Sequence, residues 1–134
     1  MSTSTVKYAG SLRTECTHHR SGNTLITDAP IDNKGKGEAF SPTDLTATSL
    51  AACMLTIMGI TANEKGIDLG SPSAEVTKVM YSEPRRIGEI HIEVRMDRAF
   101  DEKQRKLLER AALTCPVANS LDPKIDQRIA FRYD

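Results

Sequence analysis

The order of apolar and polar positions along the chain predicts strands first, then a long helix, then further strands and helices. Between residues 4 and 29, short runs are separated by turns that contain Gly and Ser, and Ser-Gly-Asn at 21–23 is a hairpin signal. Residues 31–40 (IDNKGKGEAF) show no periodicity and are rich in Gly and Lys, which predicts a connecting loop that could cover a site.

The longest apolar segment carries clear helix signals at both ends. Ser41 is a good N-cap, Pro42 suits the first helical position, and Asp44 lies three residues after the cap. Gly66 suits a left-handed C-cap. Between Leu50 and Ile60 the helix is apolar on nearly every face, which predicts that protein surrounds it.

The second half of the chain predicts two strands, two helices and a last strand. Alternation with charged residues indicates a half-buried antiparallel strand at 89–97. Its apolar positions are Ile90, Ile92, Val94 and Met96. A helix is expected from Asp101, with Gln104 completing its cap, and a short helix after Cys115.

This order predicts an α+β fold, with antiparallel sheets packed around a long buried central helix. Neither an internal repeat nor a linker interrupts residues 1–134, so one domain is expected. A helix that is apolar on all sides is hard to enclose in so short a chain. We therefore expect a second copy of the chain to cover it, in a homodimer.

Composition excludes some function classes. The chain has 18 Lys and Arg against 18 Asp and Glu, and no basic run interleaved with aromatic residues, so nucleic acid is not an expected partner. The N-terminus lacks the pattern of a secretory signal. The apolar stretch 45–62 contains five Ser and Thr residues and follows a strong cap, so a core helix is expected, not a membrane span.

Two of the three cysteines are associated with predicted helices. Three widely spaced cysteines do not form a secreted disulfide pattern, so a reducing cytoplasm is expected. Cys115 precedes Pro116 at a helix N-terminus, where the helix dipole favours a thiolate. Cys53 lies deep in the long helix, and a buried thiol there needs a fixed cation nearby to react. The positions alone leave two readings open, namely reactive thiols and inert packed ones.

Two separated motifs carry a family resemblance. The segment SPTDLTATSLAACMLTIM and, some sixty residues later, TCPVANSL resemble the OsmC/Ohr family of thiol peroxidases. The shared features are a Pro at a helix start, small residues around the first Cys, and a second Cys followed by Pro. The resemblance extends over essentially the whole chain and implies an OsmC-like domain in an intertwined dimer with sites at the interface.

The resemblance also implies a chemistry. Cys53 matches the peroxidatic thiol of the family, and Cys115 matches the resolving thiol. Organic hydroperoxides would be the preferred substrates, with hydrogen peroxide reduced less well. An external thiol or dithiol, such as dihydrolipoamide, would supply electrons, and neither a metal nor an organic cofactor is implied.

The resemblance also implies charged partners for the thiolate. In the family an Arg in an Arg-x-Gly turn stabilises the thiolate, and RSG places Arg20 in that role, with Arg13 as the rival. An ordinary surface Arg is the alternative reading. Family members commonly carry a Glu after the helix-start Pro, where this chain has Thr43. Asp44 or Glu38 could substitute for that Glu, or Asp44 could be only a cap.

A non-catalytic protein of the same fold, binding a small hydrophobic ligand, is the alternative function. Cys16 and His18 would share a face of a strand. Structural zinc usually takes four protein ligands, and no second pair has suitable spacing, so no metal site is expected.

Overall fold

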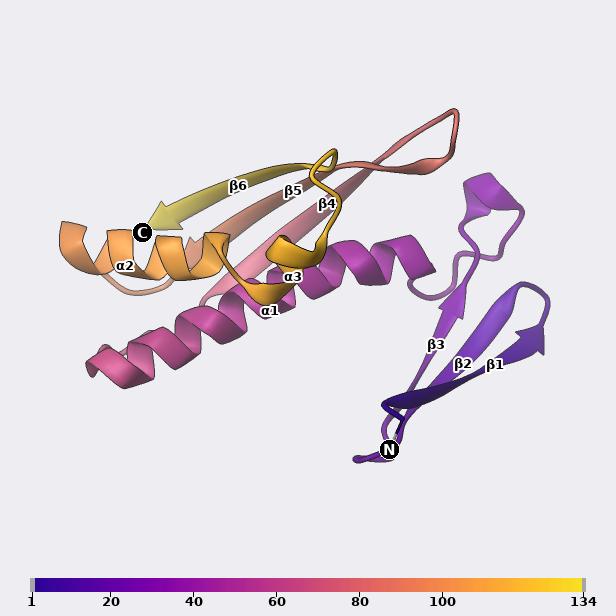
Figure 1. The fold of residues 1–134 in the computed structure, drawn as a ribbon, viewed down its shortest axis with the longest axis horizontal. Helices are drawn as coiled ribbons and strands as arrows, with labels where there is room; N and C mark the ends of the chain where they lie inside the picture. The colour runs from indigo at the N-terminus through magenta and orange to yellow at the C-terminus, as the bar shows by residue number, and fades with distance from the viewer. Residues whose placement is uncertain (1, 134) are drawn as a thin grey trace. The chain divides into compact units, whose positions relative to one another are not determined.

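The structure is a computed structural model that describes residues 2–133. It divides into two compact units, one up to Thr46 and one from Ala47 onward. The elements of the first unit are β1 (Ser4–Gly10), β2 (Arg13–His18), β3 (Thr24–Asp28), the 3-10 helix η1 (Ile31–Asn33) and the start of α1 (Pro42–Lys65) (Figure 1). After α1 follow β4 (Ser73–Tyr81), β5 (Arg86–Met96), α2 (Glu102–Leu113), α3 (Pro116–Ser120) and β6 (Asp126–Tyr133).

The first unit is a three-stranded antiparallel sheet in the order β1-β2-β3. Val6 pairs with Cys16, and Cys16 pairs with Leu25, so these side chains lie on one face of the sheet. The predicted hairpin at Ser-Gly-Asn is confirmed, because Gly22 adopts φ 76° in the turn between β2 and β3. None of the described residues before Ala47 belongs to the buried apolar core.

Both predicted ends of α1 are confirmed. The backbone N–H of Ser41 donates to the Asp44 carboxylate at 3.0 Å, and the Asp44 N–H donates to the Ser41 hydroxyl at 3.0 Å. This reciprocal pair satisfies two N–H groups that the first turn of a helix leaves without partners. Gly66 follows the last helical residue with φ 67°, a conformation that glycine adopts without steric cost.

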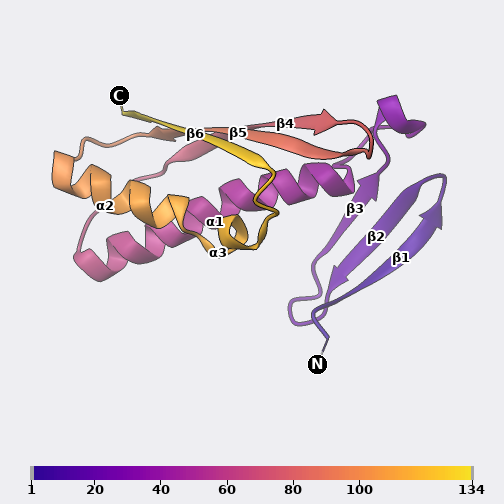
Figure 2. The ribbon, with the colours of Figure 1, turned by 45° about the horizontal axis from the view of Figure 1, so that its top comes forward.

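The second unit contains a mixed sheet in the order β4-β5-β6. Strands β4 and β5 are antiparallel, as expected, but β5 and β6 are parallel. The prediction of purely antiparallel sheets was therefore wrong for this pair. Helices α2 and α3 lie between these two strands in the chain, and a crossover of this kind returns the chain to the starting end of the sheet (Figure 2).

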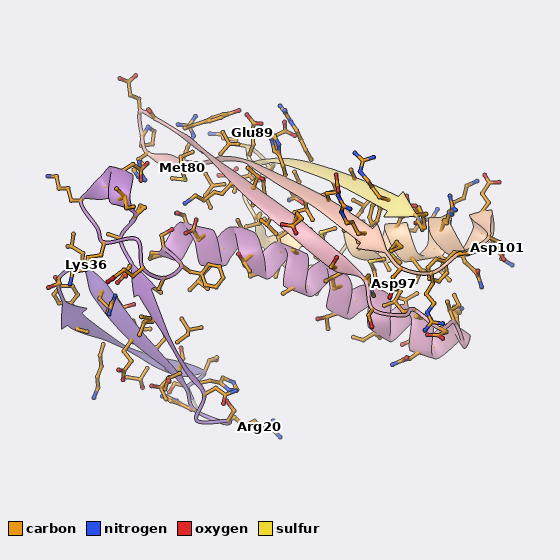
Figure 3. The ribbon with its side chains drawn as sticks, turned by 180° about the vertical axis from the view of Figure 1, so that it is seen from behind. Arg20, Lys36, Met80, Glu89, Asp97 and Asp101 are labelled. Atoms are coloured by element: carbon orange, nitrogen blue, oxygen red, sulfur yellow. The ribbon has the colours of Figure 1, made fainter. Side chains whose placement is uncertain are left out.

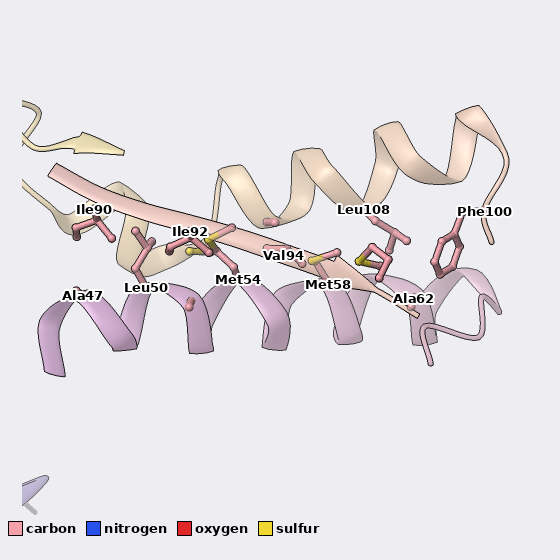
Figure 4. Packing of buried hydrophobic residues seen from close by; sticks show 14 residues of the cluster. Ala47, Leu50, Met54, Met58, Ala62, Ile90, Ile92, Val94, Phe100 and Leu108 are labelled. Atoms are coloured by element: carbon pink, nitrogen blue, oxygen red, sulfur yellow. The ribbon is translucent and has the colours of Figure 1, made fainter. Parts of the chain in front are cut away.

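The hydrophobic core lies between α1, α2 and the inner face of β5 (Figure 4). The alternation predicted for β5 is confirmed, because all four of its predicted apolar positions are buried. Helix α2 begins with the predicted capping box of Asp101 and Gln104, and it buries Leu108 and Ala112. These contacts form one contiguous apolar cluster that includes Cys115.

One face of α1 is buried and another is open within a single chain. Its buried residues are Ala47, Leu50, Ala51, Met54, Met58 and Ala62. Ala52, Thr56 and Ile60 follow each other at a spacing of four residues and are exposed. By length and composition α1 could also cross a membrane, but core helices of soluble proteins pass the same test. The sequence predicted a fully enclosed helix, and one chain encloses only part of it.

Candidate active site at two cysteine thiols

The fold brings Cys53 and Cys115 together. Cys53 lies midway along α1 and is half-buried, whereas Cys115 is the N-cap of α3 and is fully buried. The Cys53 side chain lies close enough to the Cys115 thiol to raise the pKa of Cys115. Both thiols are free. The short helix α3 lies beside the middle of α1 in both ribbon views, which explains how residues 62 positions apart become neighbours (Figures 1 and 2).

Burial is the dominant influence on the Cys115 thiol. It raises the pKa of Cys115 above its ordinary value of 9.0, and the neighbouring Cys53 raises it further. The N–H of Ala118 donates to the Cys115 sulfur at 3.5 Å and opposes this shift. The sequence predicted that the helix N-terminus would favour a thiolate. The N–H groups of Ala118 and Val117 do lower the pKa of Cys115, but desolvation is the larger effect, so the net shift is upward.

The surroundings of the thiol pair are apolar. Met54 is buried next to Cys53 in the chain, and Val117 and Ala118 of α3 and its C-cap Leu121 pack at the border of the core. The side chain of Gln127 on β6 donates to the Ala118 carbonyl at 3.3 Å and ties α3 to the sheet.

A second cluster forms in the first unit around Arg13. Its guanidinium donates to both carboxylate oxygens of Asp28, at 2.7 and 2.8 Å, and to Glu38 at 3.1 Å. Asp28 is almost completely buried and also accepts the backbone N–H of Glu38 at 3.1 Å. The hydrogen bond from Arg13 holds the pKa of Asp28 below its usual range, and the same contact raises the pKa of Arg13.

The remaining predicted residues occupy different places. Arg20 is exposed at the tip of the β2–β3 hairpin, and its side chain has no ion pair or hydrogen bond within residues 2–133 (Figure 3). Asp44 forms the α1 cap described above, and Thr43 contacts the Ser41 hydroxyl at 3.2 Å. Glu38 is thus brought to Arg13, the rival of Arg20. Which arginine serves Cys53 stays a prediction.

The sequence pattern did not indicate a role for Asp28. Its signal was weak, namely one acidic residue at the end of the strand TLITD. Strand alternation alone does not show that this carboxylate is buried, because burial depends on the loop 30–40 folding back over it. Backbone bonds fix that loop, among them Asp28 N–H to the Phe40 carbonyl at 3.0 Å.

The His and Cys residues that could act as metal ligands make other contacts. Within residues 2–133, no three His, Cys, Asp or Glu side chains come together in a way that could hold a metal ion. Cys16 and His18 lie on the same face of β2, and His18 contacts the Ser21 hydroxyl at 2.7 Å. His91 on β5 pairs with Glu89 at 2.7 Å.

Solved structures with similar folds were found. A crystal structure of a proposed osmotic-stress-induced and detoxification-response protein from Psychrobacter arcticus is 55% identical, with a TM-score of 0.95 over 98% of this chain and 96% of that one. An organic hydroperoxide resistance protein OsmC from Legionella pneumophila is 20% identical, with a TM-score of 0.77 over 98% and 97%. An OsmC-like protein from Mycoplasma pneumoniae is 17% identical, with a TM-score of 0.81 over 97% and 94%.

The comparison with curated proteins gives no match. The family model described as OsmC-like protein matches residues 35–129, which is well over half of the chain and crosses the boundary between its two units. That match includes α1 with Cys53 and the Cys115-Pro116 motif. Together with the close structural relative, it shows that the chain belongs to the OsmC-like protein family.

Proposed function

We propose that this protein is a thiol-dependent peroxidase that reduces organic hydroperoxides with Cys53 and Cys115. The observation that carries the proposal is the proximity of the two free thiols, which shifts the pKa of Cys115, beside the apolar core of the second unit. Two thiols this close can store the electron pair that a peroxide must receive. Relatives of the same fold include an organic hydroperoxide resistance protein, which supports the proposal.

The first step oxidises Cys53. The Cys53 thiolate attacks one oxygen of the hydroperoxide, an S–O bond forms, and the O–O bond breaks. The other oxygen leaves with its organic group and takes up a proton, giving an alcohol. Two electrons pass from sulfur to oxygen, and Cys53 becomes a sulfenic acid.

The second step forms a disulfide. The Cys115 sulfur attacks the Cys53 sulfur, an S–S bond forms, and the sulfenic oxygen leaves as water together with the thiol proton. An external dithiol then reduces this disulfide by two exchange steps, which restores both thiols and oxidises the dithiol. A reducing compartment, as in the cytoplasm, would keep such a donor available.

We further propose that the working form is a homodimer. Three observations support it: the open face of α1, the absence of core residues among those described before Ala47, and the apolar face of the first sheet. On that sheet Val6 is 61% exposed and Tyr8 is 68% exposed. A hollow of about 290 Å³ lies beside Cys16 and Leu25 on the same unit. Apolar surface of this kind is typical of a protein interface.

Peroxide consumption with a dithiol donor tests the proposed activity. The parent protein should consume an organic hydroperoxide, Cys53→Ser should abolish turnover, and Cys16→Ser should leave it nearly intact. Cys16 is a matched control because it is also half-buried but lies on β2 in the first unit. Equal turnover in Cys53→Ser and the parent would contradict the assignment of Cys53. Absence of turnover in the parent would favour the alternative, a protein that binds a small hydrophobic ligand.

A further inference from the structure

A basic surface lies on the second unit, at the end of α1 and along α2. Lys65, Lys103, Lys106 and Arg110 surround a hollow of about 350 Å³, with Leu107 as its apolar part. We call this surface the basic hollow. Its four cationic side chains are exposed, whereas Leu107 is half-buried. Helix α2 lies along the C-terminal part of α1 here, with Leu108 beneath it (Figure 4).

Most of the positive charge in the basic hollow is uncompensated. Lys106 has one partner, Glu102 at 3.6 Å, and both side chains are strongly exposed, so the pair is weak. Lys65, Lys103 and Arg110 have no ion pair within the described residues 2–133. Because the whole chain has a formal net charge of zero, this is a local concentration of positive charge and not a property of the entire surface.

Helix stability does not account for this arrangement. Lys65 and Arg110 lie in the last turns of their helices, where the helix dipole favours cations. Lys103 lies in the first turn of α2, where the dipole disfavours them. Lys106 and Arg110 are also four residues apart, and like charges at that spacing repel. The cluster is therefore suited to an anion from outside the chain.

The basic hollow shares α1 with Cys53, and the end of α2 leads into Cys115. Lys65 lies twelve residues after Cys53 on α1, which corresponds to about 18 Å of helix rise. On the other side, Arg110 precedes Cys115 by five residues. A standard protein interface buries about 800 Å² on each partner, which is a patch roughly 30 Å across. A patch of that size centred on the hollow reaches about 15 Å, so a docked protein would extend along α1 toward Cys53.

We propose that the basic hollow docks an acidic surface of the protein that carries the reducing dithiol. This inference rests on the proposed peroxidase function. Charge complementarity at a docking site raises the association rate and selects among partners. The docked donor gives two electrons and two protons to the Cys53–Cys115 disulfide, whose S–S bond breaks, and the donor itself becomes a disulfide.

Two synthetic peptides with the same Cys-Gly-Pro-Cys dithiol test the proposal. One carries four glutamates and the other four lysines, and each reduces protein that one equivalent of organic hydroperoxide has converted to the disulfide. At low salt the parent should be reduced about tenfold faster by the acidic peptide. The preference should vanish near 1 M salt, where the screening length falls to about 3 Å. Equal rates for the two peptides at low salt would overturn the proposal.

A charge-reversal pair and a matched control locate the effect. Lys103→Glu with Arg110→Glu should abolish or invert the preference for the acidic peptide. Lys34→Glu with Lys124→Glu makes the same change in net charge at exposed lysines outside the hollow, and it should keep the preference. Comparing the ratio of the two rates between variants cancels the intrinsic reactivity of each peptide. An equal loss in both double variants would overturn the docking site.

A direct binding measurement distinguishes the docking proposal from the proposed peroxidase function. A tetraglutamate peptide without cysteines should bind the parent and compete with the acidic dithiol peptide, even if no peroxide is ever reduced. Inorganic phosphate at equal ionic strength should compete less well. If phosphate competes equally, the hollow is a site for a small anion and the docking proposal fails. If the disulfide never forms with peroxide while tetraglutamate still binds, only the proposed function fails.

Discussion

At the scale of single residues, the two thiols differ in ways that suit two successive roles. Cys53 is partly accessible on α1, whereas Cys115 has 0% exposure and a pKa raised mainly by burial. A reactant can therefore reach Cys53 first. Cys115 remains largely a protonated thiol at neutral pH until Cys53 has been oxidised.

The pKa of Cys115 predicts a pH dependence for disulfide formation. Because this pKa lies above 9.0, the thiolate fraction is small at pH 7 and rises about tenfold per pH unit toward the pKa. After oxidation of Cys53, the rate of disulfide formation should therefore increase between pH 7 and pH 9. Rapid mixing followed by acid quench and peptide mapping measures this rate. A rate that stays flat over that range would show that Cys115 is not the attacking group, and Cys115→Ser should leave Cys53 as a trappable sulfenic acid.

The arginine that assists Cys53 can be identified by alkylation. Arg20→Ala is expected to slow both the alkylation of Cys53 at pH 7 and the formation of the disulfide, since a buried thiolate needs a nearby cation. Arg20 has no side-chain partner within residues 2–133, so its removal should leave the fold intact. If the alkylation rate of Cys53 is unchanged in Arg20→Ala but lower in Arg13→Lys, then Arg13 is the residue that stabilises the Cys53 thiolate.

At the scale of elements, the loop between β3 and α1 contains one close backbone contact, between Gly35 and Ala29. A Cβ atom at Gly35 would lie 1.7 Å from the carbonyl oxygen of Ala29, which cannot move without displacing the chain. The same loop carries Glu38 to Arg13 and Asp28. The local conformation of Gly35 and the ion-pair cluster are therefore coupled.

Gly35→Ala is expected to destabilise the protein more than a control at another turn. The control Gly22→Ala also changes a turn glycine, with φ 76°, but a Cβ there meets open space. It should cost only the strain of a left-handed residue, about 1–2 kcal/mol. Chemical unfolding of both variants measures the difference. Similar free energies of unfolding for the two would show that the loop relaxes easily and that its fit is unimportant.

At the scale of the whole molecule, one chain leaves much apolar surface uncovered. Ile60 on α1 is 47% exposed, and Val6 and Tyr8 on the first sheet are 61% and 68% exposed, so both units carry exposed apolar side chains. Burying such surface contributes about 25 cal/mol per Å². We propose a second copy of the chain as the partner that covers this surface.

The protein is expected to be a dimer in light scattering at micromolar concentration. Ile60→Glu places a charge on the open face of α1 and should shift the protein toward monomer, because burying an unpaired charge is costly. Leu113→Glu, at the end of α2, changes a residue of similar exposure and is the control. If the parent protein is a monomer at all concentrations, the homodimer proposal is wrong, and dimer formation does not explain the open face of α1.

The sequence alone determined the elements of this protein because their signals are local. Capping residues placed the start of α1 at Pro42, Gly66 marked its end, and alternation marked the buried face of β5. Two motifs also sufficed for the family, since the residues around Cys53 and Cys115 are contiguous in the chain.

Only the tertiary structure decided how distant segments combine. Pairing of β5 with β6 is parallel, because the direction of a strand depends on the crossover between the strands. The proximity of the two thiols and the raised pKa of Cys115 depend on where α3 packs, and the Arg13–Asp28–Glu38 cluster depends on a folded loop. Burial and long-range contacts arise from the whole chain, so no local pattern of residues contains them.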